Sequence, residues 1–462
     1  MVYQISLFLR CIFYRTTPLG FLLTSIPKTF TSWPTTQQQT GPKIGYNNQD
    51  NGFCRFDRVR IPRTNMAMRY ATLSRDGKYT AAAKRKQASY STMTLVRASI
   101  VIDSGQALSA AATIAIRYSA VREQGFSGRG DGSEMCVLDY PMQQARLFPF
   151  LASAFAFHFT GVSMTTLLRS EDIAALHLAS SGLKALCSKL TCLGIEACRQ
   201  ACGGHGYLLA SGLPELLGTY KQTATVEGEN YMIAQQTTKA LLKMLRGRPG
   251  KSAAAVVAAA AAASTSASPS SSVLHGKDTD YVAHAAHIAR HDRNAATGVA
   301  DVMDPAWQVR AYRQRAAWIL VDLEAKLTAV QASTCSGGMN AADAWIAFCP
   351  DIVRASEAHC LYVLVRNFAL AVEQLEREGS ALAAVLGEQR DLFALWWMQE
   401  RSGEFFESGF LAHPEQAQFV REGVRRRLQS VRPNAVALVD GWGHSDHMLH
   451  SALGRRDGKV RE

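Results

Sequence analysis

The sequence predicts a mainly α-helical protein with a small β-rich segment near its N-terminus. Apolar residues recur at helical spacing over four long segments between residues 95 and 245, and a further apolar stripe follows beyond residue 350. Only residues 53–63 alternate apolar and polar side chains in the manner of a half-buried strand. Hydrophobic residues make up 47% of the 462, which excludes a wholly disordered chain, a collagen-like repeat and a small disulfide scaffold.

The positive charge is concentrated at one end of the chain. The net charge is +12, and residues 1–100 hold fifteen Lys/Arg and three Asp/Glu. No basic stripe alternates with stacking aromatic residues and no zinc-knuckle pattern is present, so we expect no nucleic-acid partner. A basic surface that attracts an anionic small molecule explains the charge as well.

The N-terminal segment and the cysteines bear on location. Residues 1–40 form an unassigned basic segment whose composition fits either an organelle-targeting sequence or an unusual start. The ten cysteines include no Cys-x-x-Cys pair and no regular framework, which favours a reducing compartment. Residues 147–168 carry no charge and are long enough to span a bilayer, but Pro149 and His158 favour a buried core helix, so we expect no membrane span.

Four helices are expected before residue 250. The first two cover residues 95–122 and 148–168. The third begins after Ser170 as N-cap, with acidic residues 171–172 in its first turn, and ends at the C-cap signal of residues 203–204. The fourth covers residues 231–245, and four long amphipathic helices predict a bundle.

The C-terminal half is expected to be a second α-helical domain. Residues 250–272 are of low complexity, rich in Ala and then in Ser, Thr and Pro, and are typical of an exposed linker. Helical periodicity then resumes, and its clearest stripe consists of Leu361, Leu364, Phe368, Val372 and Leu375.

Two elements between residues 199 and 231 are candidates for chemistry. The glycines 203 and 204 allow a ligand to approach the backbone closely, and Glu227, which follows Val226, is a candidate general base. On the residues alone, a helix C-cap and an acid at a helix start explain the same pattern. Neither the Cys198, Cys202 and His205 group nor the histidines 444, 447 and 450 form a convincing zinc pattern, so we assign no metal site.

Collinear motifs give the chain a resemblance to the acyl-CoA oxidase family. Among them are IAIRYSAVR at 114–122, ACGGHGY at 201–207, EGEN at 227–230 and RPNAVALVD at 432–440. Further matching stretches lie at 41–47, 50–53, 55–63, 68–70, 138–140, 143–149, 194–199, 357–360 and 453–458, so the resemblance covers roughly residues 41–460.

The resemblance implies an enzyme of fatty-acid β-oxidation. Such flavoproteins use FAD to oxidise an acyl-CoA to trans-2-enoyl-CoA and reduce molecular oxygen to hydrogen peroxide. Glu227 matches the catalytic base, and its backbone N–H matches the group that polarises the thioester carbonyl. The resemblance also implies peroxisomal location, although the last four residues, 459–462, are not a Ser-Lys-Leu type signal.

The same resemblance implies a cofactor site shared between subunits. Arg122 and Gln124 match an Arg-x-Gln pair that reaches the FAD diphosphate and adenosine of a partner subunit, and Gly203 and Gly204 match a glycine pair against the same cofactor. A shared site implies a homodimer.

The implied architecture has five parts. They are an unassigned segment (1–40), a remnant of the middle β-barrel domain (41–88), a four-helix bundle like that of acyl-CoA dehydrogenases (89–248), a linker (249–280) and a C-terminal α-domain (281–462). Family members carry an N-terminal α-domain and a complete β-barrel before the point that Gly41 matches, so we expect a truncated chain.

Two alternatives to an active oxidase stay open. The first is a catalytically inactive fragment or subunit of an acyl-CoA oxidase. The second is an acyl-CoA dehydrogenase that uses a protein electron acceptor, although the EGEN sequence and the length of chain after Glu227 favour the oxidase.

Overall fold

The structure is a computed structural model. It describes residues 35–49, 51–58, 60–66, 68, 71–81, 88–126, 132–170, 172–247, 277–294, 296–332 and 338–460, with the backbone alone at 35–39, 54, 56, 81, 88–92 and 126. The low-complexity segment 250–272 and most of segment 1–40 lie outside the described residues. The chain divides into two compact units, one of Met1–Thr92 with Gly218–Gln222 and one of Met93–Leu217 with Thr223–Glu462.

The first unit contains two small antiparallel hairpins. Strand β1 (Thr35–Gln39) pairs with β2 (Gly52–Phe56), and β3 (Ala71–Leu73) pairs with β4 (Tyr79–Ala81). The predicted strand 53–63 is therefore correct only in its first part. The chain bends after Phe56, because Arg58 adopts a left-handed φ of 52°, which does not continue a strand.

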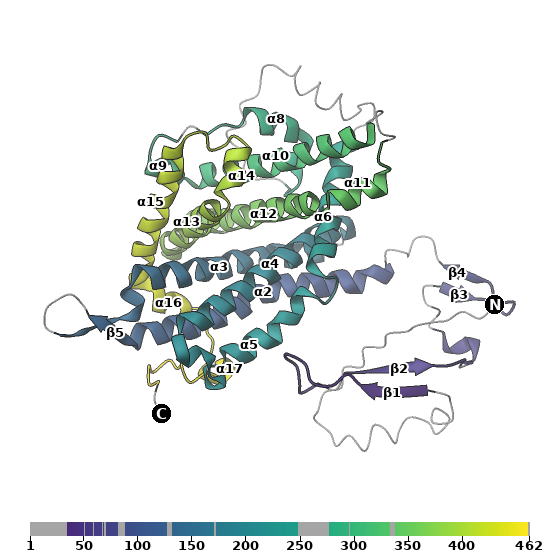
Figure 1. Cartoon of the computed structure of the whole chain (residues 1–462), viewed down its shortest axis with the longest axis horizontal. Helices are drawn as coiled ribbons and strands as arrows, with labels where there is room; N and C mark the ends of the chain where they lie inside the picture. Colours follow the sequence, from purple (N-terminus) through teal and green to yellow (C-terminus); the bar gives the residue numbers. More distant parts are fainter. Residues whose placement is uncertain are drawn as a thin grey trace. The chain divides into compact units, whose positions relative to one another are not determined.

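Four long helices form the first half of the second unit, as predicted. They are α2 (Ala88–Val121), α3 (Pro141–Arg169), α4 (Ile173–Ala201) and α6 (Asn230–Arg246), and Figure 1 shows α2, α3 and α4 running side by side. A hairpin of β5 (Glu123–Phe126) and β6 (Glu134–Cys136) connects α2 to α3.

Glycines set the close contact between α2 and α3. A Cβ on Gly105 would lie 3.0 Å from the carbonyl oxygen of Ala154, and one on Gly161 would lie 3.1 Å from the Cα of Ile102. The segments Met93–Val121 and Pro141–Arg169 are long and apolar enough to cross a membrane, yet 67% of each apolar window is buried inside the protein. They therefore form the core of this unit.

The start of α4 differs from the prediction. Ser170 does not cap α4 but ends α3, where its hydroxyl donates to the carbonyl of Leu167. The N-cap is Asp172, whose Oδ1 accepts a hydrogen bond of 3.0 Å from the N–H of Ala175. The carboxylate accepts from the free N–H groups of the first turn and carries the negative charge that a helix N-terminus prefers.

The C-terminal half is also helical and shares the same core. Its helices are α8 (Ala285–His291), α9 (Val299–Val302), α10 (Pro305–Ala332), α11 (Ala341–Ala347), α12 (Cys349–Arg377), α13 (Leu382–Glu400), α14 (Ser402–Glu407), α15 (Pro414–Val431), α16 (Ala435–Asp440) and α17 (Asp446–Leu449). Figure 1 shows α12 between α10 and α3.

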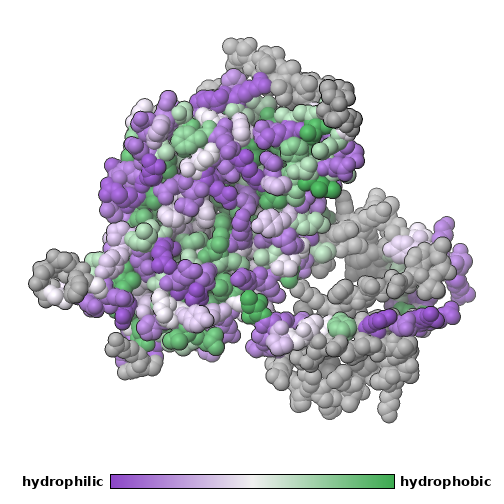
Figure 2. Space-filling view, viewed as in Figure 1, coloured by the Kyte–Doolittle hydropathy of each residue, from purple (hydrophilic) through white to green (hydrophobic). Residues whose placement is uncertain are grey.

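The fold is mainly α, as the sequence predicts. The stripe expected on α12 is buried at Leu361, Leu364, Phe368 and Val372. Polar bonds join the two helical halves: Thr238 donates to the carbonyl of Ile352 at 2.6 Å. The visible face of the helical unit is mostly hydrophilic, with smaller apolar areas (Figure 2). The boundaries of two separate helical domains stay a prediction.

Candidate active site and cofactor face

Glu227 lies in a strained turn just before α6. Its φ of 59° and the φ of 102° at Gly228 are both left-handed, a conformation that a residue with a side chain rarely adopts. Glu229 caps α6 through Oε2, which accepts from the N–H groups of Tyr231 (2.9 Å) and Met232 (3.3 Å). The turn therefore holds Glu227 in one fixed backbone conformation next to a helix N-terminus.

Two buried cations from other helices bind this turn. Arg97 of α2 donates through Nε to the carbonyl oxygen of Glu227 at 2.8 Å. Lys184 of α4 donates through Nζ to the carbonyl oxygen of Gly228 at 2.8 Å and to Oδ1 of Asn230 at 2.9 Å. Both side chains are buried, so their charges act through little solvent.

The charges of this cluster affect one another. Burial lowers the pKa of Arg97, and the charge of Glu227 opposes that shift. Burial also lowers the pKa of Lys184 to about 8; the charge of Arg97 acts in the same direction, and the carboxylates Glu229 and Glu227 act against it. Glu227 thus lies on a rigid turn whose backbone carbonyls bind two buried cations, and its charge acts on both of them.

The second group of predicted site residues lies at the other end of the bundle. Arg122 directly follows α2, and Gln124 is in β5, where its carbonyl accepts from the hydroxyl of Tyr140 at 2.8 Å. Gly203 and Gly204 begin the 3-10 helix η5 (Gly203–Tyr207). Both glycines are exposed, and a Cβ added at either would meet no atom within 4 Å.

A hydrogen bond joins the end of α2 to the 3-10 helix that carries the glycine pair. The hydroxyl of Tyr118, on the last turn of α2, lies 3.0 Å from Nδ1 of His205 in η5. Burial raises the pKa of Tyr118, and the nearby charge of Arg122 opposes the shift. The structure therefore brings Arg122 and the glycine pair to one face of the protein. We call the surface of Arg122, Gln124, Gly203 and Gly204 the cofactor face, after the role that the resemblance implies for these residues.

Glu227 and the cofactor face are far apart within one chain. A helix rises 1.5 Å per residue, which puts Arg97 and Tyr118 about 30 Å apart along α2. The two groups of predicted site residues therefore lie far apart within one chain.

Sequence reasoning missed Arg97, Lys184 and Tyr118. Lys184 had a signal, because it is a single cation within the apolar stripe of α4. The other two had none, since a helix pattern does not indicate which distant turn a side chain reaches.

The described residues contain no group of three or more His, Cys, Asp and Glu side chains arranged to hold a metal. His205 contacts Tyr118, and burial raises the pKa of Cys202 to about 12. A thiol of that kind is a poor source of the thiolate that binds zinc.

Two family models match the chain and identify its family. The model for the acyl-CoA oxidase C-alpha1 domain matches residues 90–242, and the model for acyl-CoA oxidase matches residues 304–462. The chain belongs to the acyl-CoA oxidase family, as the sequence motifs predicted.

Named relatives agree. The chain is 37% identical over 433 residues to peroxisomal acyl-coenzyme A oxidase 1 of Arabidopsis thaliana, an alignment that covers 91% of this chain and 60% of the relative. The relative of the same name from Bos taurus is also 37% identical, with 91% and 61% covered. The chain thus spans about 60% of the length of these curated relatives.

Solved structures show the same similarity. Acyl-CoA oxidase 1 of Arabidopsis thaliana superimposes with a TM-score of 0.79 at 35% identity, covering 92% of this chain and 62% of that one. Acyl-CoA oxidase-1 of Caenorhabditis elegans, solved with FAD and ATP, gives a TM-score of 0.76 at 31% identity, with 92% and 59% covered.

Proposed function

We propose that this chain is an FAD-dependent acyl-CoA oxidase, which converts an acyl-CoA to trans-2-enoyl-CoA and O2 to H2O2 in peroxisomal fatty-acid β-oxidation. The observation that carries the proposal is the position of Glu227, a carboxylate on a rigid left-handed turn beside Arg97 and Lys184. Membership of the acyl-CoA oxidase family supports the proposal.

Glu227 would remove a proton from the α-carbon of the thioester. That proton is weakly acidic, so the base must be held at a fixed distance and the developing enolate charge must be stabilised. Arg97 and Lys184 hold the backbone of the turn, and the N–H of Glu227 would donate to the thioester carbonyl oxygen.

The cofactor face fits the diphosphate of FAD. The open space above Gly203 and Gly204 lets an anion approach the backbone, and the guanidinium of Arg122 matches a diphosphate in charge and geometry. Gln124 would complete the contact. When bound, FAD would supply the acceptor for the β-hydride of the substrate and pass the electrons on to oxygen.

Two subunits are needed for this arrangement. Because Glu227 and the cofactor face lie at opposite ends of α2, we place the FAD that the cofactor face binds at the Glu227 of a partner, which makes a homodimer the functional unit.

The test is anaerobic reduction of FAD. The purified chain is mixed with FAD, and the flavin absorbance is followed before and after an acyl-CoA of medium chain length is added without oxygen. We expect bleaching by the substrate and formation of H2O2 when air is admitted. Absence of any bound flavin would refute autonomous activity, and bleaching without peroxide would favour a dehydrogenase.

Glu227→Gln is the decisive variant. It removes the base but keeps the size of the side chain, so we expect FAD to bind normally and bleaching to slow by at least about a hundredfold. Glu229→Gln is the matched control, because it changes an exposed carboxylate two residues away that caps α6. Equal loss of bleaching in both variants would contradict the role of Glu227.

A further inference from the structure

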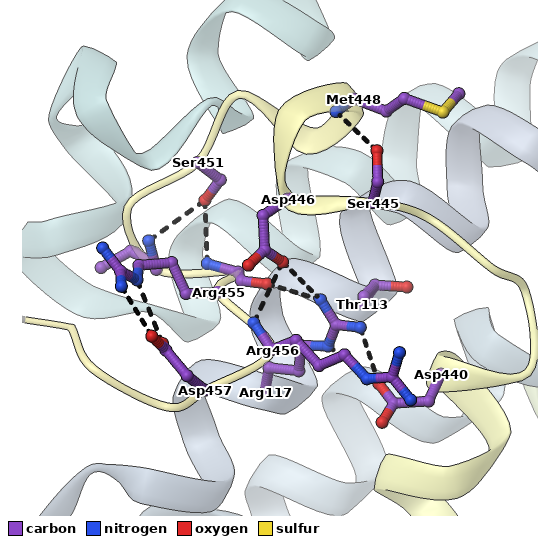
Figure 3. Close-up of polar contacts among 12 residues, drawn as sticks. Thr113, Arg117, Asp440, Ser445, Asp446, Met448, Ser451, Arg455, Arg456 and Asp457 are labelled. Atoms are coloured by element: carbon purple, nitrogen blue, oxygen red, sulfur yellow. Dashed lines mark hydrogen bonds and ion pairs between the residues drawn. The ribbon is translucent and has the colours of Figure 1, made fainter.

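The C-terminal segment of the chain, residues 440–460, packs against the end of α2. The segment is held there by Arg117 of α2, a buried cation whose side chain is 6% exposed. The guanidinium donates through Nε to Oδ1 of Asp440 at 2.9 Å and through Nη1 to the carbonyl oxygen of Gly454 at 2.7 Å. Figure 3 shows the Arg117 side chain between Asp440 and Asp446.

A second carboxylate of the segment, that of Asp446, also contacts Arg117. Oδ1 of Asp446 lies 3.4 Å from Nη1 of Arg117 and accepts a hydrogen bond of 3.0 Å from the N–H of Arg456 (Figure 3). Ser451 accepts from the N–H groups of Leu453 and Gly454. One guanidinium therefore holds three separated points of the segment: Asp440, Asp446 and Gly454.

The same segment also supports the loop that carries the glycine pair. The N–H of Ala452 donates to the carbonyl oxygen of Ala210 at 2.8 Å. A Cβ on Gly212 would lie 2.9 Å from the carbonyl oxygens of Leu449 and His450, so the backbones are in close contact. The loop 203–212 is thus fixed on one side by Tyr118 through His205 and on the other by the C-terminal segment.

We propose that Arg117 is a positioning residue for the cofactor face: it anchors the C-terminal segment, and the segment holds loop 203–212 so that Gly203 and Gly204 present their backbone to the FAD diphosphate. Arg117 precedes Tyr118 directly and Arg122 by five positions, so both supports lie near the end of α2, shortly before the guanidinium proposed to bind the diphosphate. This inference rests on the proposed function, which supplies the FAD.

Arg117→Leu tests the inference in the full-length chain. The expected results are faster amide hydrogen exchange across residues 203–212 and FAD binding about tenfold weaker, a change typical of residues that act on a site without touching the ligand. FAD affinity is measured by quenching of flavin fluorescence, below the unfolding transition of each variant. Asp440→Asn is the milder second variant, and we expect the same two changes in smaller size.

Arg313→Leu is the matched control. Arg313 is similarly buried and pairs with Asp292 at 2.6 Å, but it belongs to α10. It is expected to lower stability without changing exchange in 203–212 or FAD affinity, so a general loss of stability is distinguished from a loss of positioning.

The outcomes separate the two proposals. If the unaltered chain binds FAD and the Arg117 and Asp440 variants bind it equally well, the positioning role is refuted and the oxidase proposal stands. If the unaltered chain binds no FAD, the oxidase proposal fails and the positioning role fails with it. Weaker FAD binding in all three variants, Arg313→Leu included, would also refute positioning.

Discussion

Lys184 is the buried charge whose removal gives the sharpest physical prediction. Its side chain is 0% exposed, and its ammonium group donates to the carbonyl of Gly228 and to Asn230. Burial lowers its pKa from 10.5 to about 8. The folded protein therefore binds this proton less tightly than the unfolded chain does.

The sign of the pH dependence follows from that difference. Between about pH 8 and pH 10.5 the unfolded chain holds the proton and the folded protein does not, so stability rises with pH. At 1.36 kcal/mol per pKa unit, the charged Lys184 costs the folded state about 3 kcal/mol at pH 7, and most of this cost is relieved by pH 10.

Lys184→Met removes the titrating group and keeps most of the side-chain volume. We expect the free energy of unfolding of the unaltered chain to rise between pH 7 and pH 10 by about 2–3 kcal/mol relative to this variant. At pH 7 the variant escapes the cost of the buried charge but leaves the Gly228 carbonyl without its donor, a loss of about 1–3 kcal/mol, so its stability there should change little.

The assay is urea unfolding followed by tryptophan fluorescence at pH 7 and pH 10. Lys189→Met is the control, since Lys189 is on the same helix, is 38% exposed and pairs with Glu357 at 2.6 Å. We expect it to keep the pH dependence of the unaltered chain. An identical pH dependence in the unaltered chain and Lys184→Met would refute the reasoning.

Three further predictions concern backbone and packing. Gly204→Ala should weaken FAD binding with no change in melting temperature, because the added methyl group meets no protein atom but occupies the space proposed for the diphosphate; an unchanged FAD affinity would contradict the cofactor face. Gly182→Ala should lower the free energy of unfolding by about 1–3 kcal/mol, since its Cβ would lie 2.6 Å from the Sγ of Cys360 and 2.7 Å from Oγ1 of Thr237. Asp172→Ala should lower the free energy of unfolding by about 1 kcal/mol, because it removes the N-cap of α4, whereas Ser170→Ala should lower it by less. Urea unfolding of the two variants measures this, and the opposite order would contradict the assignment of Asp172 as the cap.

Part of the fold and of the site could be predicted from the sequence alone. Helical periodicity located α2, α3, α4 and α6, because the apolar stripe of a helix is a local property of the sequence. Motif resemblance identified the family and singled out Glu227 and the cofactor-face residues. Their roles remain proposals, which the experiments above test.

Local sequence patterns gave wrong predictions at two places, the N-cap of α4 and the end of the predicted strand. Ser170 and Asp172 are both good N-cap residues, and the end of α3 decided between them, because Ser170 is used in closing that helix. The strand predicted for residues 53–63 ends at Phe56, since alternation of side chains does not reveal the left-handed turn at Arg58.

The sequence by itself determined the helices, the family and the residue types that carry the proposed chemistry, because periodicity and motifs are properties of neighbouring residues. Only the tertiary structure decided which charges meet. It brought Arg97 and Lys184 to the turn of Glu227 and joined Arg117 to Asp440, across 323 residues of sequence. The physical reason is that a buried charge must find partners among whatever groups the packing of helices brings near, and that packing is set by the whole core rather than by any local segment.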